Sequence, residues 1–135
     1  MPAVRHRSIV VLCAALLLAG LASGCGPAAV ETIGFGTGGS GCTLANGAST
    51  FTTRVPVQFV ATFVPDLPAG ASVAISLSQD GKDLPDLAGT VHLDQGQNCV
   101  GGGWRSLATG HYRVVINPSS ETGMPPLSGE FDVTP

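Results

Sequence analysis

The sequence predicts an all-β protein whose folded part is a small antiparallel β-sandwich. Three observations support this prediction. Apolar residues alternate with small or polar ones in several short segments beyond residue 50, clusters of turn-forming residues separate these segments, and no window offers a capped helix of ten residues. A chain of 135 residues has room for one ordinary domain. We therefore expect a single sandwich and no second domain.

Five segments have the strand period, and each is bounded by turn chemistry. They cover residues 57–63, 73–78, 91–93, 112–116 and 130–133. Glycine, proline, asparagine and aspartate gather at residues 65–70, 95–98, 101–103 and 117–118, which we predict to be turns. Asp80 and Gly81 stand between two polar pairs and are predicted to form a two-residue hairpin turn.

The last two of these strands resemble a known family. In the segment 107–114, Tyr112 follows Gly110 by two positions, and the segment 127–133 has the pattern of a closing strand. Together they resemble the end of immunoglobulin-like and fibronectin-type domains. The resemblance spans about residues 56–133 and implies an immunoglobulin-like sandwich, in which the tyrosine hydroxyl would fix a corner between two strands.

The N-terminus is typical of an export signal. Arg5, His6 and Arg7 form a short basic start, and residues 9–22 are apolar except for Gly20. This run is shorter than the roughly 20 residues that a membrane-spanning helix needs. Its length and flanks favour a secretory signal.

The signal ends in Leu21-Ala22-Ser23-Gly24-Cys25, where small residues stand directly before a cysteine. This string resembles the lipobox of bacterial lipoproteins. The resemblance implies a signal peptide over 1–24, cleavage before Cys25, and lipidation of the Cys25 thiol. Such a cysteine carries at least two acyl chains, such as palmitate, which are enough for stable attachment. The alternative is conventional cleavage at the small residues, with Cys25 an ordinary cysteine.

The segment that follows is rich in glycine. Residues 26–41 hold six glycines, one proline and a single charge, Glu31. Such a segment buries little apolar surface to offset its ordering entropy, so we predict a flexible tether over 25–41. The sandwich would then occupy residues 42–135.

The charge pattern excludes two classes of partner. After cleavage the chain would keep four basic and nine acidic residues, a formal charge of −5. The basic residues are scattered at Arg54, Lys82, Arg105 and Arg113. Binding to nucleic acid or to anionic headgroups needs clustered positive charge, so neither is expected.

The cysteines predict one disulfide. Cys13 would be lost with the signal and Cys25 would carry the lipid, which leaves Cys42 and Cys99. Two thiols in an exported, oxidising compartment favour a bond between them. A metal or redox pair and free thiols are the alternatives.

Few residues suggest a metal or ligand site. Asp80, Asp83 and Asp86 lie in one short loop and could supply oxygen ligands to Ca²⁺, although a solvated turn is the simpler interpretation. His92 and His111 would form a two-histidine site only if their strands were neighbours. Trp104 follows three glycines and is either a candidate ligand contact or a plug of the sandwich core.

No catalytic group stands out, so the sequence favours a protein that is not an enzyme and that needs no cofactor. The mature part has two histidines, and no serine lies in a Gly-x-Ser-x-Gly context. We expect an interaction or structural module, anchored to a membrane through Cys25 and facing outward in a bacterial cell envelope, with a protein or polymer partner. The alternative is a carrier or sensor of a small ligand or ion.

Overall fold

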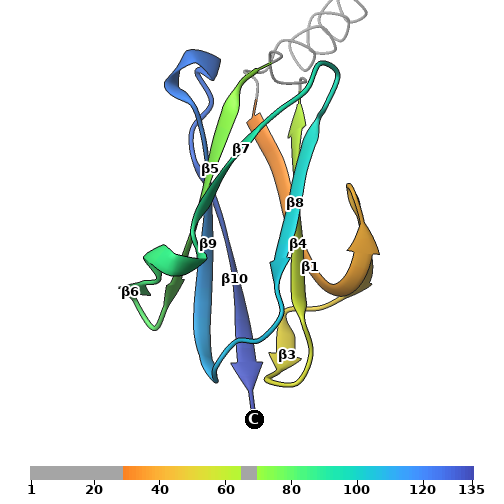
Figure 1. Cartoon of the computed structure of the whole chain (residues 1–135), viewed down its shortest axis with the longest axis vertical. Coiled ribbons are helices and arrows are strands. Elements are labelled where there is room, and N and C mark those ends of the chain that lie inside the picture. The colour runs from red at the N-terminus through yellow and green to blue at the C-terminus, as the bar shows by residue number, and fades with distance from the viewer. Residues whose placement is uncertain (1–28, 65–69) are drawn as a thin grey trace, which may run out of the picture.

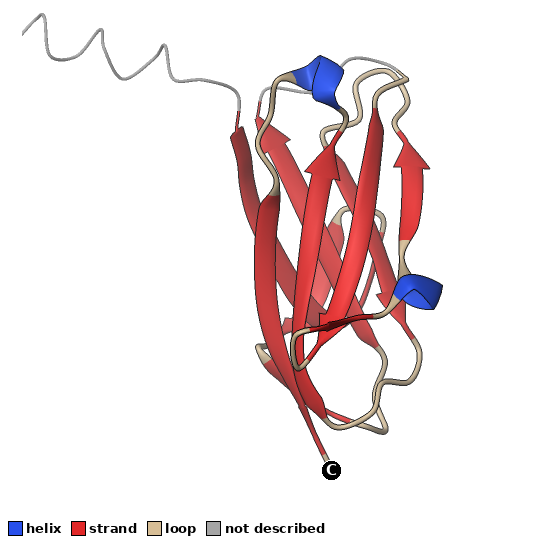
Figure 2. Ribbon diagram, turned by 90° about the vertical axis from the view of Figure 1, so that its left-hand side faces the viewer, coloured by secondary structure: helices blue, strands red, loops and turns tan. Residues whose placement is uncertain are grey.

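Two β-sheets pack face to face in the computed structural model, which describes residues 29–64 and 70–135 (Figures 1 and 2). This arrangement confirms the predicted all-β sandwich. The predicted signal 1–24 and Cys25 lie outside the described residues. Within the two described ranges, no helix has both the length and the apolar character to cross a membrane.

The first sheet has four antiparallel strands in the spatial order β2-β1-β4-β8. Their bounds are β1 Ala29–Ser40, β2 Thr43–Gly47, β4 Val57–Val64 and β8 Cys99–Trp104. β1 lies beside β4 from Ala29 to Gly36 and then turns into a tight hairpin with β2. Figure 1 shows β1 running along β4 before it curves away.

The second sheet has the order β3-β10-β9-β5-β6, and β7 also pairs with β5. Its strands are β3 Thr50–Thr52, β5 Ser72–Gln79, β6 Lys82–Asp83, β7 Gly89–His92, β9 Gly110–Pro118 and β10 Leu127–Thr134. The short β3 runs parallel to β10, and every other pair is antiparallel. Two short 3-10 helices, η2 (Pro85–Leu87) and η3 (Ser120–Thr122), lie between strands.

The predicted hairpin turn is confirmed. Gln79 pairs with Lys82 across it. Asp80 and Gly81 both have positive φ, 50° and 81°, as a type I′ turn requires of its two central residues. Glycine and aspartate accept this backbone more readily than most residues.

The prediction of a flexible tether over 25–41 is wrong for residues 29–40, which form β1. Glycine is depleted in strands because it has no side chain to pack, so a glycine-rich segment has no typical strand pattern. Here the glycines allow close approach of two backbones: a Cβ on Gly36 would overlap the carbonyl oxygen of Ala45 on β2. Phe35, between two glycines, is buried. The described part of the sandwich therefore begins at Ala29 and not at Cys42.

Residues 101–103, predicted to be a turn, lie in the middle of strand β8. Each of the three glycines allows a close contact. A Cβ would lie 2.7 Å from the oxygen of Gly41 at Gly101, 3.1 Å from the Phe59 ring at Gly102, and 2.7 Å from the oxygen of Val57 at Gly103. These glycines serve close packing within the sheet.

The core is filled by the inward faces of both sheets, as alternation predicts. Phe131 on β10 is its aromatic centre. Its ring centroid lies 4.9 Å from Phe35, 5.2 Å from Tyr112, 5.7 Å from Phe51 and 6.2 Å from Trp104. Aromatic pairs at such distances add stability beyond the apolar area that they bury.

Tyr112 fixes a corner before β9, as the immunoglobulin-like resemblance implied. Its hydroxyl donates a hydrogen bond of 2.7 Å to the carbonyl oxygen of Ala108, in the loop that leads into the strand. Burial raises the pKa of this hydroxyl, so it stays protonated and acts as a donor. The hydrogen bond ties the β8–β9 connection to the core.

Candidate functional site

A hollow lies on the outer face of the first sheet. It has a volume of about 500 Å³ and opens between the β1–β2 turn and the outward faces of β4 and β8. We call this hollow the hairpin recess. Its polar side chains are Ser40, Thr43, Gln58, Gln97 and Arg105.

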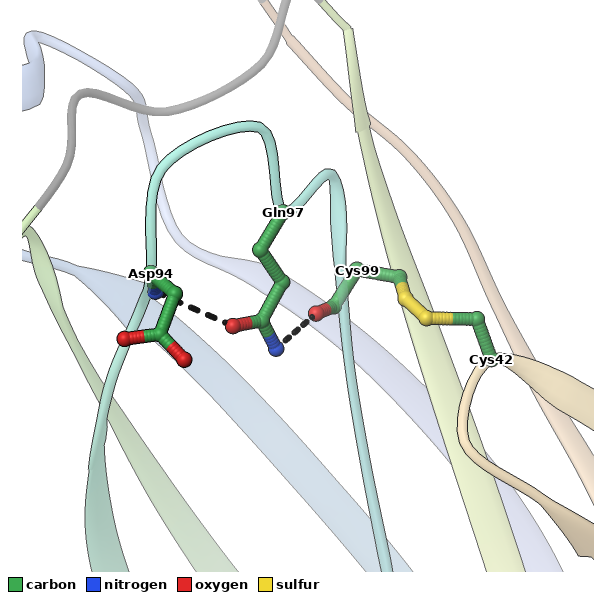
Figure 3. Close-up of a disulfide and its surroundings, with 4 residues drawn as sticks. All are labelled: Cys42, Asp94, Gln97 and Cys99. Carbon is green, nitrogen blue, oxygen red and sulfur yellow. Dashed lines mark hydrogen bonds between the residues drawn. A yellow bond between two sulfur atoms is a disulfide. The ribbon is translucent and has the colours of Figure 1, made fainter.

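A disulfide holds the β1–β2 turn over this face. Cys42, in the turn, is bonded to Cys99, the first residue of β8 (Figure 3). The pairing predicted from the cysteine arithmetic is confirmed. Gly101 stands two residues after Cys99 on the same face, where the absence of a side chain leaves room for the carbonyl oxygen of Gly41. The disulfide and the close approach of Gly41 to Gly101 together bring the turn against β8.

Gln97 braces the entry to β8 beside the disulfide (Figure 3). Its side-chain oxygen accepts a hydrogen bond of 3.1 Å from the backbone N–H of Asp94, and its side-chain nitrogen donates one of 2.9 Å to the carbonyl oxygen of Cys99. One side chain thereby joins both ends of the β7–β8 loop. The carbonyl of Cys99 is satisfied within the chain.

Trp104 is mainly a core residue. It is 9% exposed, and its ring stacks on Phe59 at 5.3 Å. Its indole N–H donates a hydrogen bond of 3.3 Å to the carbonyl oxygen of Leu87. The sequence left two alternatives for Trp104, a ligand contact or a plug of the core. Most of the side chain lies in the core. Its small exposed part lines one end of the recess beside Arg105.

Among residues 29–64 and 70–135, β8 is an edge strand, and part of its backbone has no strand partner. The N–H of Phe63 donates to the carbonyl of Asn98 at 2.8 Å, and residues 99–104 continue the same register. Opposed residues of an antiparallel pair alternate between hydrogen-bonded and non-bonded positions. Val100, Gly102 and Trp104 therefore bond to β4. Gly101 and Gly103 direct their N–H and C=O groups to the open side.

The three aspartates proposed as Ca²⁺ ligands are not brought together. Asp80 instead accepts a hydrogen bond of 3.0 Å from the backbone N–H of His111, on the neighbouring strand β9. Asp83 lies in β6, and Asp86 lies in η2. Across residues 29–64 and 70–135, no group of three or more His, Cys, Asp or Glu side chains is placed to hold a metal ion.

His111 belongs to a different cluster, on the outer face of the second sheet. Its Nδ1 lies 2.7 Å from Oδ1 of Asp132, and its Nε2 lies 3.6 Å from Oε2 of Glu130, both on β10. The hydrogen bond to Asp132 is the main cause that raises the pKa of His111. His92 pairs with Ser72 at the first residue of β5. His111 lies near the other end of β5, where Ser78 pairs with Arg113. The two histidines therefore form no joint site.

Sequence reasoning missed the main parts of the recess. Its hairpin was assigned to a tether, and the glycines of β8 were assigned to a turn. One signal could have found β8: the apolar pair Cys99 and Val100 and the aromatic Trp104 flank the glycines at strand spacing. The hairpin had a weaker signal, since Ile33 and Phe35 alternate with glycines.

Comparison with known proteins gives a distant structural likeness only. No family model matches the sequence, and no curated protein sequence matches it. The similar solved structures include a superoxide reductase (neelaredoxin) from Ignicoccus hospitalis, with 13% identity and a TM-score of 0.44. That match covers 64% of this chain and 76% of the reductase. Two variants of the same reductase also match, each with a TM-score of 0.43, and each match covers 75% of the variant's chain.

These neighbours correct one expectation drawn from the sequence. We expected a protein that is not an enzyme, whereas the solved structures that it resembles are named as reductases. The expectation of no catalysis is therefore withdrawn. A likeness at this identity and TM-score assigns no reductase activity to this chain either.

Proposed function

We propose that this protein is a lipid-anchored binding module of a bacterial cell envelope, attached through Cys25, and that it engages a protein or polymer partner at the hairpin recess. The Cys42–Cys99 disulfide indicates an oxidising, extracytoplasmic environment. The lipobox-like string before Cys25 supports the anchor. The observation that carries the binding role is the recess itself, which is lined by both cysteines of the disulfide.

The position of β1 changes the expected distance from the membrane. Only residues 26–28 separate Cys25 from Ala29, the first residue of β1. Four Cα–Cα steps span at most about 14 Å, whatever their conformation. Ala29 pairs with Val64, and Cys99 pairs with the nearby Thr62. The proposed anchor would thus hold the disulfide end of the sandwich close to the bilayer.

The anchor is tested by fractionation. The wild-type chain should be found with membranes, and its N-terminal peptide should carry added lipid mass at Cys25. Cys25→Ser should leave the membrane fraction or remain uncleaved. Cys13→Ser is the matched control, because that cysteine lies inside the predicted signal. The anchor is excluded if wild type and Cys25→Ser fractionate alike and no lipid mass is found.

The binding role is tested by site-specific photo-crosslinking in cells. A photoreactive residue in place of Gln58, in the recess, should give one discrete adduct. The same residue in place of the exposed Ser76, on the outer face of the second sheet, should not. Equal patterns at both positions would contradict a binding role for the recess.

A second candidate is a carrier or sensor of a small ligand. It is favoured by the volume of the recess, since sites for small molecules occupy about 300–1,000 Å³. The recess lies on the outer face of a sheet and not between the two sheets. Backbone groups and polar side chains line it. Native mass spectrometry of the full chain in detergent distinguishes the two candidates. A carrier should show a defined small-molecule adduct that is lost in the photoreactive Gln58 variant.

A further inference from the structure

We propose that the open edge of β8 accepts an extended peptide segment of a partner protein as an added strand, and that an acidic side chain of this peptide pairs with Arg105. The inference rests on the proposed function, because it specifies what the recess side of the first sheet binds. An added strand gains affinity from backbone hydrogen bonds and specificity from alternate side chains.

The first support is the set of unpaired backbone groups. Gly101 and Gly103 point their N–H and C=O groups away from β4, at the two-residue spacing that an incoming strand requires. All three glycines of β8 are exposed. The preceding outward carbonyl, that of Cys99, is already bonded to Gln97. The free part of the edge therefore begins at Gly101.

The second support is the lack of protection along this edge. Natural sheets usually protect edges with very short strands, lysine, proline or bulges. The edges of the second sheet follow this rule, since β3 has three residues, β6 has two and β7 has four. β8 has six residues and contains no lysine, proline or register shift. Its glycines leave no side chain to obstruct a second backbone.

The chemistry of the occupant follows from charge. Arg105 is the one charged residue that lines the recess, it is exposed, and within the described ranges it forms no ion pair. A carboxylate on the incoming strand would complement it. A second copy of this chain fits less well, because residues 99–105 contain no acidic residue to face Arg105.

The test uses the full chain in detergent, with its disulfide intact, and a phage-displayed library of random 12-residue peptides. Enriched peptides should contain an acidic residue beside β-branched or aromatic residues at alternate positions. In ¹⁵N spectra with a synthesised binder, the amides of Gly101 and Gly103 should shift and become protected from hydrogen exchange. Methylation of the peptide nitrogens that face β8 should abolish binding, whereas methylation of the intervening ones should not.

Arg105→Glu should weaken the binder by about fivefold, which corresponds to the upper end of the range for an exposed ion pair. Lys82→Glu, on the second sheet, makes the same change in net charge and should leave affinity unchanged. Substituting the glycines is not informative, because a Cβ on Gly101 or Gly103 would meet backbone oxygen at 2.7 Å.

Four outcomes would overturn strand addition: no enriched peptide, a binder that leaves Gly101 and Gly103 unprotected, equal losses for Arg105→Glu and Lys82→Glu, or dimers formed by the free chain through β8. The proposed function fails separately, through the fractionation of Cys25→Ser or the crosslinking at Gln58. A discrete adduct at Gln58 without protection at Gly101 would keep the binding module and exclude the added strand.

Discussion

Cys42 and Cys99 are separated by 57 residues in the chain, and their Cα atoms lie 6.0 Å apart. The bond joins a hairpin turn to the first residue of an edge strand. It therefore links the β1–β2 hairpin to the strand at the opposite edge of the same sheet, beyond β4. We therefore expect the shape of the hairpin recess to depend on whether Cys42 and Cys99 are oxidised.

Reduction should strongly destabilise the fold. Closing a loop of this length removes unfolded-state entropy worth roughly 4 kcal/mol in the chain-entropy model, which is a large part of the 5–15 kcal/mol typical of domains. We expect reduced wild type and oxidised Cys42→Ser to melt at similar temperatures, on the order of 15 °C below oxidised wild type. Calorimetry measures this shift. An unchanged melting curve, or free thiols in non-reducing peptide maps, would contradict it.

Removal of residues 1–41 should abolish folding. This deletion takes away β1, which lies between β2 and β4 and carries the buried Phe35. β4 would lose its partner on one side, and Cys99 would keep its bond only to a detached strand. Far-ultraviolet circular dichroism should show no cooperative transition. A chain that begins at Ala29 retains every described strand and should melt cooperatively. A cooperative melt of the shorter chain would disprove the role of β1.

Tyr112→Phe isolates the corner hydrogen bond. The ring of Tyr112 is buried and stacks on Phe131, so phenylalanine preserves the packing and removes only the hydroxyl that bonds to Ala108. We expect the free energy of unfolding to fall by about 1 kcal/mol, the usual net value of such a bond. Tyr112→Leu also removes the ring and should cost more. Urea denaturation compares the two variants, and equal losses would show that the hydroxyl is not the relevant group.

Stability should depend on pH through His111. Its pKa is raised in the folded state, chiefly by the hydrogen bond to Asp132. Folding therefore gains from protonated His111 below its unfolded pKa of about 6.5, and this gain is lost as pH rises through the higher folded pKa. We expect melting temperatures of wild type and His111→Gln to converge above that pKa and to differ below it. His92→Gln is the control. A constant difference at all pH values would refute this linkage.

The sequence by itself determined the fold class and most strands of the second sheet. In β5 and β9, apolar side chains alternate with polar ones because one face of each strand is buried, and this period is visible without any structure. The Asp80-Gly81 turn was equally predictable from the sequence, because its backbone requires residues that tolerate positive φ. The cysteine pair followed from counting thiols in a chain whose N-terminal residues predict an export signal.

Only the tertiary structure decided the parts that form the candidate site. Glycine in β1 and β8 serves contacts between backbones that are distant in sequence, such as Gly36 with Ala45 and Gly101 with Gly41. The local sequence shows that a glycine has no side chain, but it does not show which neighbouring backbone needs that space. Likewise, Asp80 had no visible partner until β9 placed the N–H of His111 beside it. The alternation of apolar and polar residues along the sequence indicates which side chains are buried. Which backbones approach each other closely is decided only when the sheets assemble.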